Sequence, residues 1–256
     1  FFEPATACLV HNNLGVPESS LALDITNACI GFSDGLIMMS HLIEAGTIKA
    51  GLICSGENIS KVVHTTLAEL LRNPEISRDQ LLQMLPTLTL GCGAAAAVLC
   101  HESISKSKHR IIGGVARSAT QHHMLCIGNG DFSVGQGEEI APIMTSDSSA
   151  LMAAAAKLGG RTFRDASQTL GWTKESVDHV FCHQVGRQVN EGFYREMGLE
   201  FAKEFTIYQK YGNMVSAAVP AALAIGCEEK KIQQGQKVLL TAFGSGLNSR
   251  FIGLEW

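Results

Sequence analysis

Short apolar runs alternate along the chain with longer stretches of helical periodicity. The short runs have the length and composition of strands. They cover residues 21–26, 50–55, 93–100, 111–115, 177–182, 237–243 and 250–256. Helices are predicted over 30–45, 148–170, 184–197 and 216–229, and Gly46 and Gly198 are placed to end two of them. Because strands and helices alternate throughout, the pattern predicts an α/β protein.

The same pattern predicts which elements are buried. Residues 30–45 are apolar on nearly every side, which is typical of a helix enclosed within a fold. The strand at 50–55 is a continuous apolar run, so we expect a sheet that is covered on both faces. The segment 118–146 is the least regular part of the chain, and a long segment of this kind is expected to be a functional cover or an insertion.

Composition narrows the class of protein. Of the 256 residues, 46% are apolar and only 17% are charged, which favours a large buried core. The net charge of −4 and the lack of a Lys/Arg run give no basis for binding nucleic acid or an anionic membrane. No apolar stretch reaches the roughly 18 uninterrupted residues of a membrane span.

The eight cysteines form no close pairs, and several lie inside apolar runs. This is typical of reduced, buried thiols in a cytoplasmic protein. No C-x-x-C spacing occurs, and no histidine pair is spaced to join a cysteine pair. We therefore expect no metal site and no other cofactor.

Three reactive or polar side chains lie where predicted strands and turns lead into helices. Cys29 precedes the helix at 30–45, His183 follows the strand at 177–182, and Asn213 follows a glycine before the helix at 216–229. A cysteine beside a helix start is close to unpaired N–H groups and the positive end of the helix dipole, which favour the nucleophilic thiolate. Singly, the three residues could be a structural thiol, a core histidine and a helix cap. Together they favour a nucleophilic active site.

The segments around these residues resemble the ketoacyl-acyl-carrier-protein synthase III branch of the thiolase superfamily. The matching segments follow the family's order: Asn27–Phe32, His183-Gln184 with Arg187, Gly212–Pro220 and Gly244–Gly246. The resemblance extends from Glu3 to Trp256 and implies a thiolase-like five-layer αβαβα fold with two pseudo-duplicated halves. We place these halves at 1–146 and 147–256.

The family's chains begin well before the equivalent of Phe1, with strands that complete the first half. The resemblance therefore implies that the N-terminal part of this half is missing from the chain. It also implies a homodimer, or a heteromer with a chain that supplies the missing segment. An open sheet edge would otherwise need a cover.

The resemblance gives each residue a role. Cys29 would accept an acyl group from a thioester, and its own N–H and that of Ser245 would form the oxyanion hole. His183 and Asn213 would hold the oxygen of the second thioester as it becomes an enolate. Glu3 is similar to the base of the head-to-head condensing enzymes of long-chain olefin biosynthesis, whereas on spacing alone it is equally a solvated carboxylate near a chain end.

The expected activity is the Claisen condensation of two fatty acyl thioesters, preferably acyl-CoA, to a β-keto product through an acyl-Cys29 intermediate. Three alternatives stay open: a decarboxylative synthase III that uses a malonyl thioester, a catalytically idle subunit of a heteromeric complex, and a cysteine hydrolase. The sequence determines neither the acyl chain length nor whether CoA or acyl-carrier protein delivers the substrate.

Overall fold

The computed structural model describes residues 3–128 and 144–256. Its helices are α1 (Thr6–Leu14), α2 (Gly31–Glu44), α3 (Ser60–Arg72), α4 (Arg78–Met84), α5 (Ser148–Leu170), α6 (Arg187–Met197), α7 (Tyr208–Tyr211) and α8 (Ala218–Glu228). Its strands are β1 (Ala50–Glu57), β2 (Gly93–Cys100), β3 (Arg110–Ser118), β4 (Cys126–Gly128), β5 (Met144–Ser146), β6 (His179–Cys182), β7 (Lys237–Gly244) and β8 (Asn248–Glu255). Among the short 3₁₀ helices that join them, η1 (Ala28–Ile30) and η6 (Val215–Ala217) carry or adjoin candidate site residues.

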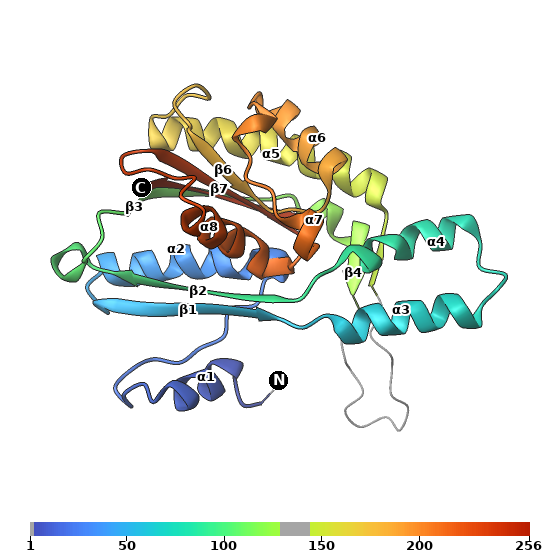
Figure 1. Cartoon of the computed structure of the whole chain (residues 1–256), viewed down its shortest axis with the longest axis horizontal. Helices are drawn as coiled ribbons and strands as arrows, with labels where there is room; N and C mark the ends of the chain where they lie inside the picture. The colour runs from blue at the N-terminus through green and yellow to red at the C-terminus, as the bar shows by residue number, and fades with distance from the viewer. Residues whose placement is uncertain (1–2, 129–143) are drawn as a thin grey trace.

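The elements are stacked in layers (Figure 1). The main sheet has the strand order β3-β8-β7-β6, in which β6 and β7 run parallel and the other pairs are antiparallel. Helices α5 and α6 lie over one face of this sheet, and α2 and α8 lie between its other face and the two-stranded sheet β1-β2. With α1 beyond β1-β2, the order is helix, sheet, helix, sheet and helix, so the predicted α/β fold of five layers is confirmed.

The main sheet is buried on both faces because its central strands are apolar at almost every position. Along β7, Val238 and Leu240 belong to the core that α2 and α8 complete, whereas Leu239 and Phe243 belong to the core beneath α5 and α6. Alternate side chains of a strand point to opposite faces, so one strand supplies both cores. Phe243 also stacks on Phe193 of α6, with ring centroids 4.3 Å apart, which holds this helix on the sheet.

The β1-β2 sheet differs from the prediction that both of its faces are covered. Ile53 is buried, but Leu52 is 43% exposed and Val98 is 70% exposed. Helix α2, predicted to be enclosed, leaves Met38 48% exposed. The reason is that α2 and α8 cover one face of the sheet, while α1 on the other side contributes no buried residue. For the described residues, the prediction of full burial is therefore wrong.

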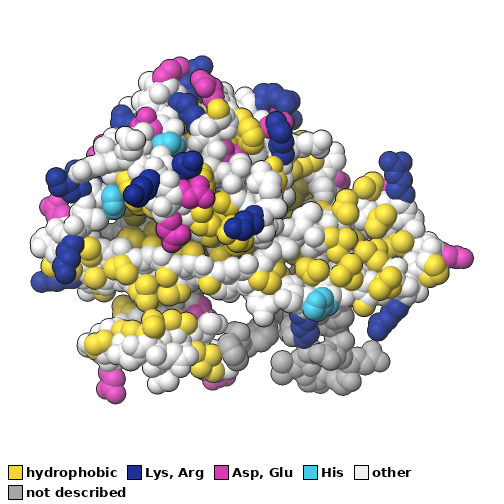
Figure 2. Space-filling model, in the orientation of Figure 1, with side chains coloured by type: hydrophobic (Ala, Val, Ile, Leu, Met, Phe, Trp, Pro, Cys, Tyr) yellow, Lys and Arg dark blue, Asp and Glu magenta, His cyan; other side chains and the backbone are white. Residues whose placement is uncertain are grey.

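Helices α3 and α4 also present apolar side chains to solvent. Leu71 is 85% exposed, and Leu67 and Leu82 are exposed as well. Figure 2 shows such side chains gathered over these two helices, in contrast to the mixed charges above the main sheet. Several apolar side chains of α3 and α4 therefore lie on the surface of this chain and not in its hydrophobic core.

The predicted strand at 21–26 takes another form. This segment is irregular and mostly exposed, although its polarity alternates like that of a strand. The carboxylate of Asp24 accepts hydrogen bonds from the backbone N–H groups of Thr6 at 2.8 Å and Ala7 at 2.7 Å. The segment therefore caps the start of α1 instead of pairing in a sheet.

The predicted helix at 184–197 begins later, at Arg187. The side chain of Gln184 is used elsewhere: its Oε1 accepts hydrogen bonds from the N–H groups of Ile207 at 2.7 Å and Tyr208 at 3.0 Å. If α6 began at Gln184, this side chain would move away from Ile207 and Tyr208 and lose both bonds. Residues 184–186 therefore form a loop before α6. The remaining predicted strands and helices are present.

The two predicted halves share the main sheet. Strand β3 comes from the first segment, 1–146, and pairs with β8 of the second segment, 147–256. The division into halves stays a prediction, and part of the expected cover insertion (129–143) lies outside the described residues.

All eight cysteines are free thiols, as predicted, but their predicted burial is only partly right. Cys182 in the main sheet is buried, whereas Cys8, Cys54 and Cys92 are exposed. These three lie on or next to α1, β1 and β2, the elements that a single copy of the chain leaves open. Their exposure therefore has the same cause as that of Leu52.

Candidate active site

Cys29 lies in η1, the turn that leads directly into α2. The preceding residue, Ala28, has a φ of +43°, a left-handed conformation that costs energy in a residue other than glycine. Two hydrogen bonds hold the turn: Asn27 Nδ2 donates to Asp34 Oδ2 at 2.6 Å, and Arg250 Nε of β8 donates to Asp34 Oδ1 at 2.5 Å. The nucleophile candidate is therefore fixed from both the helix and the main sheet.

The turn that contains Ser245 packs against the same 3₁₀ helix. A Cβ added to Gly244 would lie 3.2 Å from the side chain of Ile30 and 3.6 Å from the carbonyl oxygen of Asn27. Beyond the turn, Asn248 Nδ2 donates to the carbonyl oxygen of Ser245 at 3.3 Å. Strand β7 therefore brings Ser245 to the element that carries Cys29.

Asn213 is held by its main chain against the segment before β2. Its N–H donates to the carbonyl of Thr89 at 2.9 Å, and its carbonyl accepts from the N–H of Gly91 at 2.8 Å. A Cβ on Gly91 would lie 1.8 Å from the carbonyl oxygen of Tyr211, so only glycine permits this approach. Asn213 Oδ1 accepts from the N–H of Val215 at 3.0 Å, which leaves the side-chain N–H groups to donate to a ligand.

Helix η6 connects Asn213 to the rest of the site. It contacts η1, and its first residue, Val215, has a φ of +52°, which is rare for a β-branched residue. Ser216 donates its N–H to Glu57 Oε1 at 3.3 Å, and its hydroxyl bonds to both Glu57 and Ser55 of β1. Glu57 was not among the predicted site residues. The sequence signal for it is a pair of polar residues, Ser55 and Glu57, at alternate positions at the end of an apolar strand.

His183 follows β6 and is 3% exposed. The backbone N–H of His183 donates to the carbonyl of Thr241 on β7 at 2.7 Å, which extends the parallel pairing of β6 and β7. Burial lowers the pKa of His183 to about 4, so the imidazole is neutral at pH 7. Its Nδ1 is buried and has no hydrogen-bond partner among the described residues. A neutral imidazole offers one donor and one acceptor, and an enolate oxygen requires the donor.

The pKa of the Cys29 thiol differs from the sequence prediction of a favoured thiolate. Burial, followed by the nearby Cys126 and Glu57, raises its pKa to about 12, although the helix start was expected to favour the thiolate. Removing the sulfur from water therefore outweighs the helix end. At pH 7 the group is a thiol, so nucleophilic attack requires a base that takes its proton.

Glu3 is exposed and precedes α1. Helix α1 is tied to the chain by the Asp24 bonds at its first turn and contributes no buried residue. A single copy therefore neither buries Glu3 nor supplies an environment that makes it a base, and its catalytic role stays a prediction.

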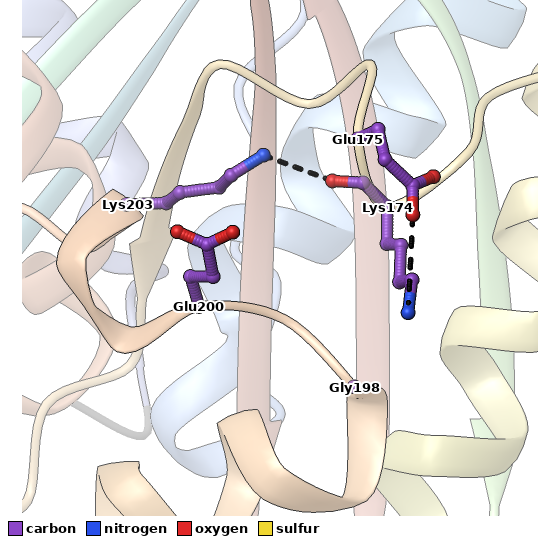
Figure 3. A pocket seen from close by; sticks show the side chains of 5 residues that line it. All are labelled: Lys174, Glu175, Gly198, Glu200 and Lys203. Atoms are coloured by element: carbon purple, nitrogen blue, oxygen red, sulfur yellow. Dashed lines mark hydrogen bonds and ion pairs between the residues drawn. The ribbon is translucent and has the colours of Figure 1, made fainter.

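A surface hollow elsewhere contains none of these residues (Figure 3). It is lined by Lys174, Glu175, Gly198, Glu200 and Lys203, and Lys203 Nζ donates to the carbonyl of Lys174 at 2.9 Å. Its charged lining does not suit an acyl chain. In the parts of the chain that the structure describes, no cluster of three metal-ligating side chains occurs, and no helix has the length and apolar character to cross a membrane.

Comparison with known families identifies the class of protein. Residues 23–119 match the model of 3-oxoacyl-[acyl-carrier-protein] synthase III, and residues 167–256 match the model of its C-terminal part. The chain therefore belongs to the 3-oxoacyl-[acyl-carrier-protein] synthase III family, whose thiolase-like members are acyltransferases.

Individual members of the family differ in how similar they are to this chain. The chain is 35% identical to the acyl-CoA:acyl-CoA alkyltransferase of Xanthomonas campestris, over 100% of this chain and 72% of that protein. It is 25% identical to the β-ketoacyl-[acyl-carrier-protein] synthase III of Oceanobacillus iheyensis, over 99% and 72%. A crystal structure of an OleA variant from Xanthomonas campestris with bound lauric acid and lauroyl-CoA superposes with a TM-score of 0.90, at 34% identity over 100% and 72% of the two chains. Other solved structures of that OleA have substitutions of a glutamate, a cysteine or a histidine.

Proposed function

We propose that this chain catalyses the head-to-head Claisen condensation of two fatty acyl-CoA molecules to a β-keto product. The observation that carries the proposal is the match over the whole chain to an acyl-CoA:acyl-CoA alkyltransferase at 35% identity, against 25–28% for synthase III proteins of several bacteria. Its reactive group is Cys29, which forms an acyl-enzyme intermediate. The alternative is a decarboxylative synthase III, which the family models also describe.

In the first step the sulfur of Cys29 attacks the carbonyl carbon of an acyl-CoA. The pKa of the thiol is raised to about 12 and that of His183 is lowered to about 4, so the imidazole cannot hold the thiol proton before the reaction. The proton therefore moves to the lone pair of His183 only as the S–C bond forms. The N–H groups of Cys29 and Ser245 hold the carbonyl oxygen as it becomes an oxyanion, each worth about 3–4 kcal/mol in comparable sites. The C–S bond to CoA then breaks, and His183 returns the proton to the departing CoA.

In the second step another acyl-CoA loses a proton from its α-carbon. Glu3 is the proposed base, and the N–H groups of His183 and Asn213 donate to the enolate oxygen. The carbanion attacks the acyl carbon on Cys29, a C–C bond forms and the C–S bond breaks. The sulfur regains a proton to become the thiol again, and this balances the α-proton that Glu3 has taken and gives up. The neutral state of His183 suits this step, because its ring can then give one hydrogen bond without carrying a charge into a buried site.

Two observations support Glu3 as the base. The substituted glutamate and cysteine of OleA are separated by the same number of residues as Glu3 and Cys29. Glu3 is also exposed in a single copy, which is the position expected of a residue that enters the site of a second copy. We therefore propose a homodimer in which Glu3 serves the partner's Cys29. A cytoplasmic location and delivery by CoA rather than by carrier protein are part of the same proposal.

The experiment that tests this function supplies two acyl-CoA molecules of different chain length and analyses the product by mass spectrometry. The proposal predicts β-keto products that combine both chains, formed by a condensation step that itself releases no CO₂. In parallel, malonyl-CoA or malonyl-carrier protein with a labelled carboxylate is offered with one acyl-CoA. Labelled CO₂ released during turnover, with no head-to-head product in the first assay, would establish the decarboxylative synthase instead.

A further inference from the structure

Behind His183, at the carboxyl end of β6, lies a buried polar cluster that the proposed chemistry does not use. It consists of Asn190 and Tyr194 of α6 and Glu204, which follows a short 3₁₀ helix and bridges to β6 at Val180. Asn190 is fully buried. Tyr194 is buried as well, and Glu204 is partly buried. Burial of polar groups costs free energy unless they are hydrogen-bonded, so the bonds that this cluster does make indicate what it does.

Asn190 is the link between this cluster and His183. Its Nδ2 donates to the carbonyl oxygen of His183 at 3.4 Å and to Glu204 Oε1 at 2.6 Å. Its Oδ1 accepts from the N–H of Val185 at 3.5 Å. The bonds to His183 and Val185 are long, whereas the bond to Glu204 is short. The side chain thus holds the main chain on both sides of Gln184 and is itself held by Glu204.

Glu204 has no cation to balance its charge. Burial raises its pKa to about 8, and the hydrogen bond from Asn190 opposes this rise only in part. The titratable groups that face it are Cys182 of β6 and Tyr194 of α6. Burial raises the pKa of both, and the charge of Glu204 raises it further. Its neighbour Lys203 instead donates to backbone carbonyls, including that of Val177 at 2.6 Å. Among the described residues no ion pair reaches Glu204, whose Oε2 is buried without a partner.

We propose that Asn190 and Glu204 are a positioning pair for His183, in which Glu204 holds the amide of Asn190 and Asn190 holds the main chain that carries the imidazole. The proposal rests on the condensing role of His183 given above. A carboxylate accepts hydrogen bonds more strongly than a carboxylic acid does. When Glu204 loses its proton, the amide of Asn190 is drawn toward it and the long bond to the His183 carbonyl is lost. The main chain at His183 then loses one of its supports, so the imidazole is held less firmly for its role at the enolate oxygen.

The test measures the two half-reactions separately on the intact chain. Acyl-Cys29 is first formed with lauroyl-CoA, and the rate of condensation with a second acyl-CoA is then measured in a single turnover at pH 7 and pH 9.5. With a pKa of about 8, only about one Glu204 in thirty keeps its proton at pH 9.5, so the condensation rate of the unmodified chain should fall about tenfold or more. In Glu204→Gln, which stays uncharged, the ratio of the two rates should be close to one.

The matched control is Glu200→Gln, since Glu200 is an exposed glutamate at the start of the same segment. It should keep the ratio of the unmodified chain. A condensation rate that does not change with pH in the unmodified chain would overturn the proposal without any variant, and so would an equal alkaline fall in Glu204→Gln and Glu200→Gln. If no acyl-Cys29 forms at all, the proposed function has failed instead, so the two failures are distinguishable.

Discussion

The turn that carries Cys29 depends on an ion pair that can be removed with one substitution. Asp34 accepts from Arg250 Nε at 2.5 Å and from Asn27 Nδ2 at 2.6 Å. In Asp34→Asn the shape is kept, but the charge is lost and Arg250 is left without its counter-ion. In either orientation of the new amide, its own N–H group also faces another donor.

The structure sets the size of the expected effect. The side chains of Arg250 and Asp34 are only 12% and 16% exposed, so water compensates little for a broken pair. Removing one partner of a buried pair typically costs about 3–5 kcal/mol, and the remaining exposure favours the lower end. A loss of about 3 kcal/mol is a large fraction of the roughly 5–15 kcal/mol that stabilises a folded chain.

Urea denaturation followed by fluorescence measures this loss, and formation of acyl-Cys29 measures its effect on the site. The matched control is Asp165→Asn, because Arg117 and Asp165 are also 2.5 Å apart but are 41% and 35% exposed. The exposed pair should contribute far less, since water screens it. Equal losses in the two variants would show that burial is not what gives the Asp34 pair its importance.

Three further predictions follow from named contacts. Gly91→Ala should slow condensation while acylation persists, because the new Cβ would lie 1.8 Å from the carbonyl oxygen of Tyr211 and displace Asn213; Gly56→Ala, which meets nothing within 4 Å, is the control in the same product assay. Asn213→Asp keeps the acceptor for Val215 but loses the donor N–H groups, so the condensation rate should fall by about 10²–10³, measured as a single turnover from preformed acyl-Cys29. Glu204 has a pKa raised from 4.5 to about 8, so the free energy of unfolding should fall as pH rises between these values, by at most about 5 kcal/mol. Urea titrations at pH 5 and pH 8.5 should show this fall in the unmodified chain and lose it in Glu204→Gln.

Local patterns were sufficient to predict most elements of this fold. The apolar run at 237–243 and the helix at 148–170 were predicted because periodicity and helix formers act over neighbouring residues. The strand at 21–26 was wrong for the opposite reason. The conformation of this segment depends on hydrogen bonds that Asp24 accepts from residues 17 and 18 positions earlier, and no local pattern contains such contacts.

In the candidate site, too, the residues with a local sequence signal could be predicted and those that depend on distant contacts could not. Cys29, His183 and Asn213 could be selected because each lies at a junction between elements and within a family motif. Their supporting residues could not: Asp34 is 216 positions from Arg250, and Glu57 is 159 positions from Ser216. The thiol was also misjudged, because the helix start is visible in the sequence and the burial that raises its pKa is not.

Intact-protein mass spectrometry after incubation with one long acyl-CoA tests the central claim most directly. We expect one acyl group to be added to the unmodified chain, peptide mapping to find it on Cys29, and Cys29→Ala to acquire none. The exposed Cys92 provides the control, since Cys92→Ala should be acylated like the unmodified chain. Acylation that persists in Cys29→Ala would contradict the account.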